Sequence, residues 1–224
     1  MTTARRRAVI VLGMHRSGTS ALTGLLGQMG CDLPVDLMAP AEMNAKGFFE
    51  SNKISYFNED LLASAGMTWF DLNRFPDSWY QSPKAEEFQQ RARDILRDEY
   101  GGSHLFVIKD PRVCRLVPFW ADVLAAERCE PLYVVTHRDP MEVAGSLVRW
   151  ANYEPRYGQL LWLRHVLDAE AATRGKPRVF VSYDQVMADW RAVVARIGTG
   201  LNVVWPRPPE RMASEVDQLL SRGL

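Results

Sequence analysis

The segment at residues 13–20, GMHRSGTS, constrains the fold more than any other part of the chain. It follows the apolar run at residues 8–12 and precedes the apolar stretch at residues 21–26, which is the order strand, glycine-bracketed loop, helix. Backbone N–H groups at the start of a helix lack partners within the helix and point towards an anion. The segment therefore predicts a loop that binds a phosphate-like group, and a tight turn that binds nothing is the alternative.

The loop differs from that of the nucleotide triphosphatases in its cation. Their loop carries a lysine directly after the second glycine, whereas this chain has Thr19 there and places its cation inside the loop as Arg16. We therefore expect phosphate binding without the usual apparatus for ATP hydrolysis.

Four nearly continuous apolar runs predict strands that are covered on both faces of a parallel sheet. They lie at residues 8–12, 105–108, 132–136 and 179–182. Helical patterns follow them at residues 19–29, 116–124, 143–150 and 186–197, the last with a stop expected at Gly198. The alternation predicts an α/β fold of three layers, with a central, mainly parallel sheet flanked by helices and ligands at the carboxyl ends of the strands.

A long insert at about residues 33–100 separates the first two predicted strands. It contains two predicted helices, one at about residues 51–65 and one that starts at Ser82-Pro83 and runs to about residue 100. No repeat or linker divides the chain, so we expect one domain over residues 1–224 that includes this insert.

Composition excludes several classes of protein. Lys+Arg and Asp+Glu number 27 each, which argues against a protein that coats nucleic acid. The three cysteines form no C-x-x-C pair and the four histidines have no metal-ligand spacing, which predicts reduced thiols in a cytoplasm and no metal site. No apolar stretch approaches the ~18 residues of a membrane span. The oligomeric state is left open.

The second and third strands both end in charged residues. Lys109, Asp110 and Arg112 follow the second strand, where we expect Lys109 to contact the ligand and Asp110 either to do so or to orient the two cations. Arg138 follows the third strand, beside a helix start marked by Asp139 as N-cap and Pro140 at the first helical position. A helix N-terminus next to an arginine is a second anion-binding arrangement.

These motifs together resemble the sulfotransferase family. The loop R-S-G-T-S is followed, after a later strand, by R-D-P-x-x-x-x-x-S, which ends at Ser146. The stretch NAKGFFE at residues 44–50 is similar to the N-P-K-G-[FY]-[FW]-E stretch of bacterial members, and VIKDPR at residues 107–112 and VSYD at residues 181–184 also look familial. The resemblance extends from about residue 8 to about residue 201 and implies a P-loop-type fold.

The resemblance implies 3′-phosphoadenosine 5′-phosphosulfate (PAPS) as co-substrate, with no metal. The first motif would cradle the 5′-phosphosulfate, and Arg138 and Ser146 would hold the 3′-phosphate, although a small packing residue is the alternative for Ser146. The expected cofactor-binding residues are His15, Arg16, Ser17, Gly18, Thr19, Ser20, Arg138, Ser146 and Tyr183. The late basic-glycine stretch of some family members has no clear counterpart, since Arg222-Gly223 is too slight to count.

The implied reaction moves a sulfuryl group to a hydroxyl or amine of a small-molecule, carbohydrate or lipid acceptor. Arg16 and Lys109 would neutralise the leaving phosphate. Cytosolic animal-type members have a histidine after the strand-end lysine, and this chain has Asp110 instead. By resemblance to the bacterial pattern the base is Glu50, with a helix-start carboxylate as the alternative and His15 as the fallback base.

Two other functions stay open from the sequence. One is a nucleotide-dependent phosphotransferase of the kinase type, in which Lys109 would replace the missing loop lysine. The other is a non-catalytic nucleotide-binding protein. Stabilisation by adenosine 3′,5′-bisphosphate, compared with stabilisation by ATP and magnesium, separates them.

Overall fold

The computed structural model describes residues 5–42 and 44–221. Within them, four parallel strands form one sheet in the order β2-β1-β3-β4. The strands are β1 (Arg6–Leu12), β2 (Leu105–Lys109), β3 (Cys129–His137) and β4 (Arg178–Ser182). All four predicted strands are present, and their carboxyl ends lie along one edge of the sheet.

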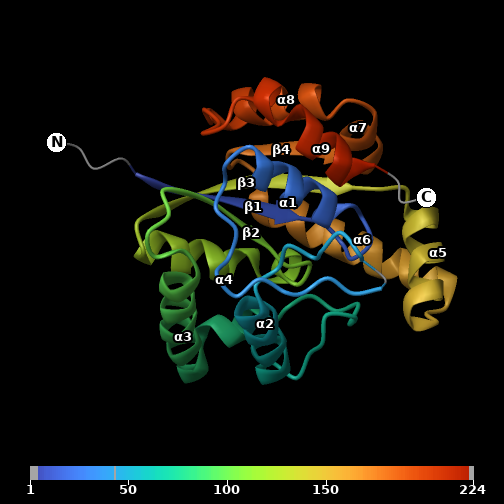
Figure 1. Ribbon diagram of the computed structural model, residues 1–224. Coiled ribbons are helices and arrows are strands. Elements are labelled where there is room, and N and C mark those ends of the chain that lie inside the picture. The colour runs from blue at the N-terminus through green and yellow to red at the C-terminus, as the bar shows by residue number, and fades with distance from the viewer. Residues whose placement is uncertain (1–4, 43, 222–224) are drawn as a thin grey trace.

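Helices cover both faces of the sheet, so the predicted three-layer architecture is confirmed (Figure 1). In that view, α1 (Thr19–Gln28), α7 (Tyr183–Ala188), α8 (Trp190–Leu201) and α9 (Ala213–Leu220) lie above it. The helices α2 (Asn52–Ser64), α3 (Pro83–Tyr100), α4 (Val113–Ala126) and α6 (Pro155–Thr173) lie below it, and α5 (Pro140–Ala151) stands at the right edge. None of the described helices is long and apolar enough to cross a bilayer.

The strand side chains divide between the two layers. Ile10 packs with the core of α2, α3, α4 and α6, whereas Val9 and Val11 pack with the core of α1, α7, α8 and α9. Burial of one such side chain stabilises the fold by about 1.5–3 kcal/mol. Because both faces are covered, the strands read as continuous apolar runs rather than as alternating ones.

The amino-terminal arm of the insert runs from the start of β2 to the start of α2. Asp32 bridges to Phe106 of β2, and Leu37 pairs with Ser51 just before α2. Ser51 caps α2 by accepting a hydrogen bond of 3.1 Å from the backbone N–H of Ile54. Both insert helices lie within a residue of their expected bounds, and a short 3-10 turn (Asp77–Gln81) separates them.

Three features of the helices differ from the expectation. Helix α6 was not predicted, because it exposes Leu160, Leu163 and Leu167 and so lacks a clean apolar stripe. The helix expected over residues 186–197 breaks at Asp189, whose side chain caps α8.

The helix stop expected at Gly198 is wrong, because α8 continues to Leu201. A Cβ atom at residue 198 would lie only 3.1 Å from Nε1 of Trp205 and 3.1 Å from the carbonyl oxygen of Val203. This glycine therefore permits close packing inside the helix rather than ending it.

Candidate active site

The loop between β1 and α1 turns through two residues with positive φ angles. Arg16 has φ 68° and Gly18, which precedes α1, has φ 83°. A Cβ atom at residue 18 would lie 2.4 Å from a ring carbon of Tyr183, so only glycine fits under that ring. The loop backbone and the start of α7 are thereby in direct contact.

A cavity of about 220 Å³ opens where the loop, the insert and the strand ends meet. It is lined by nearly all of the residues that the sequence analysis selected, namely His15, Arg16, Gly18, Thr19, Ser20, Glu50, Lys109, Arg138 and Tyr183. Two selected residues lie behind this lining. Ser17 is fully buried, and the buried Oγ of Ser146 accepts a hydrogen bond of 2.8 Å from Nε of Arg16.

Lys109 and Glu50 form a buried ion pair in the cavity wall, with 4% and 6% of their surfaces exposed. The ammonium group of Lys109 also donates to the carbonyl oxygen of Phe48 at 2.9 Å and to Oγ of Ser20 at 3.1 Å. Burial raises the pKa of the Glu50 carboxyl group, and the charge of Lys109 only partly opposes that rise. Glu50 is therefore a stronger base than an exposed carboxylate.

Ser20 receives two hydrogen bonds on its hydroxyl oxygen. Besides Lys109, the side-chain amide of Asn44 donates to it at 3.2 Å. A hydroxyl oxygen accepts two hydrogen bonds and donates one, so the O–H of Ser20 is left to donate to a ligand. Asn44 was not among the selected site residues, although it opens the NAKGFFE stretch.

Arg138 lies at the mouth of the cavity, held by two side chains. Its Nε donates to Glu142 at 2.6 Å, and its guanidinium carbon lies 4.6 Å from the ring centroid of Tyr183. Asp139 caps α5, as predicted, by accepting from the backbone N–H of Met141 at 2.7 Å. Exposed ion pairs contribute only about 0.2–1 kcal/mol, so an anion can displace Glu142 from Arg138.

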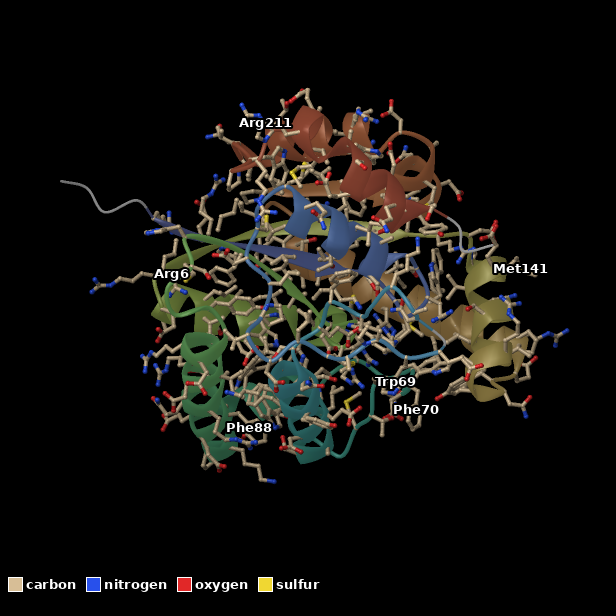
Figure 2. All side chains as sticks on the ribbon, viewed as in Figure 1. Arg6, Trp69, Phe70, Phe88, Met141 and Arg211 are labelled. Carbon is tan, nitrogen blue, oxygen red and sulfur yellow. The ribbon has the colours of Figure 1, made fainter. Side chains whose placement is uncertain are left out.

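His15 is enclosed by aromatic rings. Its ring centroid lies 4.5 Å from that of Trp69 and 5.5 Å from that of Trp150. Figure 2 shows Trp69 in the loop below the sheet, on the side of the molecule where α5 stands. Burial, and after it the charge of Arg112, holds the pKa of His15 well below its usual value. Burial therefore disfavours the protonated form of His15 and weakens it as the fallback base.

The two other charged residues of the segment at the end of β2, Asp110 and Arg112, form contacts within the protein and do not line the cavity. Arg112 pairs with Asp110 at 3.0 Å and with Glu59 of α2, and it donates to Ser55 at 3.3 Å. Asp110 therefore orients Arg112, whereas Lys109 forms its ion pair with Glu50. Lys109 alone among the three lines the cavity.

The described residues contain no cluster of three His, Cys, Asp or Glu side chains that could hold a metal ion. Arg222 and Gly223 lie outside the residues that the structure describes.

The family model that matches this chain, and three similar solved structures, are all of sulfotransferases. The model of the sulfotransferase family matches residues 8–207. Among solved structures, the chain is similar to sulfotransferase STF1 from Mycobacterium tuberculosis H37Rv, with 17% identity, a TM-score of 0.55, and coverage of 97% of this chain and 71% of that one. No curated protein matches it in sequence.

Two further structures share the fold. A sulfotransferase domain from the curacin biosynthetic pathway has 15% identity and a TM-score of 0.53, over 99% of this chain and 80% of that one. Sulfotransferase STF9 from Mycobacterium avium has 17% identity and a TM-score of 0.50, over 97% of this chain and 67% of that one.

Proposed function

The chain belongs to the sulfotransferase family, and we propose that it transfers a sulfuryl group from PAPS to a hydroxyl or amine of a small-molecule, carbohydrate or lipid acceptor. The observation that carries this proposal is the single cavity that gathers the loop cation Arg16, the Lys109–Glu50 pair and the entrance cation Arg138.

The donor would lie along the strand ends. The loop amides, Arg16 and the O–H of Ser20 would bind the 5′-phosphosulfate, together with the rest of the loop. Arg138 and Ser146 would bind the 3′-phosphate, and the ring of Tyr183 would lie between the two anionic groups. The hydrogen bond from Arg16 to Ser146 supports this arrangement, because it joins the two motifs across the fold.

Lys109 would stabilise the charge that develops on the leaving phosphate. Its ammonium group reaches the loop at Ser20 and the carboxylate of Glu50 at the same time, which supports a role between the donor and the base. Glu50 would take the proton of the acceptor as the acceptor oxygen or nitrogen attacks sulfur. The raised pKa of Glu50 suits that task.

The acceptor would enter from the side of the insert. Phe48 and Trp150 line the cavity beside Glu50, and Trp69 of the insert packs on His15. In this proposal residues 1–224 act as one domain, with residues 33–100 facing the acceptor.

The test is thermal stabilisation by two nucleotides. A ligand that binds the native state raises the melting temperature by mass action. We expect adenosine 3′,5′-bisphosphate to raise the melting temperature without magnesium, and by more than ATP with magnesium does. Equal or greater stabilisation by ATP with magnesium would favour a kinase and overturn the proposal.

A further inference from the structure

A second cavity, of about 580 Å³, adjoins the one at the loop and shares Arg138 and Tyr183 with it. Its other lining residues come from α5 and the start of α7: Met141, Glu142, Gly145, Arg149 and Asp184. Arg149 belongs to none of the motifs found in the sequence. It is exposed, and no other described residue forms a hydrogen bond or ion pair with it.

The side chain of Arg149 is directed along α5 towards Arg138. A Cβ atom placed on Gly145, one turn earlier, would lie 3.7 Å from Nη1 of Arg149. Long side chains on helices lean towards the N-terminus in this way. Burial, and after it the charges of Arg138 and Arg149, lower the pKa of Arg16. Arg138 and Arg149 therefore lie close enough to act on the charge of Arg16, which itself donates to the hydroxyl of Ser146.

The charge around the second cavity depends on Arg149. The ionisable side chains that line it, apart from the Tyr183 phenol, are Arg138, Arg149, Glu142 and Asp184, which sum to zero at neutral pH. Without Arg149 the sum is negative, while a phosphate monoester itself carries about −1.5 to −2 at pH 7. Arg149 therefore offsets negative charge that would oppose a phosphate in this cavity.

We infer that Arg149 is a further phosphate-binding residue of this site and forms, with Arg138 and Ser146, the subsite for the 3′-phosphate of the donor. The inference rests on the proposed function. Arg149 would then be a specificity-determining residue that separates nucleotides with a 3′-phosphate from those without one.

The test compares two ligands on matched variants by titration calorimetry. Arg149→Gln removes the charge, Arg149→Lys keeps it without the planar fork, and Arg156→Gln is the control at another exposed arginine with no side-chain partner among the described residues. The ligands are adenosine 3′,5′-bisphosphate and adenosine 5′-phosphate. The ratio of their dissociation constants is taken for each variant, so that a loss of folded protein cancels.

Arg149→Gln should weaken the bisphosphate about tenfold or more and leave the monophosphate within about twofold, as expected for a lost charged hydrogen bond. Arg149→Lys should lie between it and the parent, and the control should match the parent. An unchanged ratio in Arg149→Gln overturns the inference, and it would assign Arg149 to the helix C-terminus instead.

The same titrations separate the inference from the proposed function. A parent protein that binds both nucleotides equally would overturn both. A parent that prefers the bisphosphate, and loses that preference in Arg138→Ala but not in Arg149→Gln, would keep the proposed function and overturn the role of Arg149.

Discussion

At Glu50, burial and a neighbouring cation act in opposite directions on the pKa of the carboxyl group. Burial is the larger effect, so the pKa lies above its ordinary value of 4.5 even though Lys109 donates to the carboxylate. The base form is therefore lost as the pH falls through this raised pKa. We expect the rate to decline on the acid side at a pH above 4.5.

Glu50→Gln keeps the size of the side chain but cannot accept a proton at neutral pH. Turnover should fall by about 10²–10⁴, the usual contribution of a positioned base, while the affinity for adenosine 3′,5′-bisphosphate survives. The measurement is turnover on phenols of graded pKa, and the loss should be smallest on the most acidic phenol. Near-parental turnover on every acceptor, alkyl alcohols included, would remove Glu50 from the mechanism.

The carboxylate of Glu142 accepts a hydrogen bond from the guanidinium group of Arg138. In the proposed function the 3′-phosphate would bind the same group. Glu142→Gln removes this competition, so the affinity for adenosine 3′,5′-bisphosphate should rise by up to about fivefold, the upper range for an exposed ion pair. The affinity for adenosine 5′-phosphate should not change. Titration of both nucleotides checks this, and weaker binding of the bisphosphate would show that Glu142 supports Arg138 rather than competing for it.

At the scale of elements, Arg115 of α4 ties the insert to α6. Its buried guanidinium, 3% exposed, donates to Asp168 of α6 at 2.8 Å. It also donates to the carbonyl oxygens of three insert residues, Trp69 at 3.3 Å, Asp71 at 2.9 Å, and Asn73. The loop that places Trp69 against His15 is therefore anchored by a buried side chain from another element.

Arg115→Met should lower the free energy of unfolding by about 3–5 kcal/mol, because it removes the buried partner of Asp168 and leaves the loop carbonyls unpaired. Arg164→Met is the matched control. Arg164 makes a single contact with the same Asp168, and its side chain is more exposed than that of Arg115. Urea denaturation measures both variants. A loss in Arg115→Met no larger than in the control would show that the loop is held by other contacts.

The elements also show which parts of the fold can be predicted. The strands were predictable because the two covering layers make their central residues nearly all apolar. Helix α6 was not, because Leu160, Leu163 and Leu167 on its exposed side hide the apolar period. Asp189 was read as part of one helical stripe, since the spacing of buried residues continues across the break between α7 and α8.

At the scale of the whole molecule, the site follows from the topology. Parallel strands end at one edge of the sheet, so the placement of Lys109 and Arg138 near the loop could be predicted from three separate segments. The pairing of Glu50 with Lys109 could not, because it depends on the path of the insert, and only a resemblance pointed to Glu50. No motif pointed to Arg149, because its place in the second cavity depends on the position of α5 beside Arg138 and Tyr183.

Transfer of a sulfuryl group in this cavity is measured most directly with isotopically labelled sulfur. The protein is incubated with PAPS carrying labelled sulfur and a panel of phenols, alkyl alcohols, sugars and amines, with a chelator present. We expect labelled product and adenosine 3′,5′-bisphosphate in equal amounts, and a loss of about 10²-fold or more in the rate of transfer in Lys109→Ala. Transfer of the terminal phosphoryl group of ATP with magnesium to the same panel, with no transfer of labelled sulfur, would contradict this expectation.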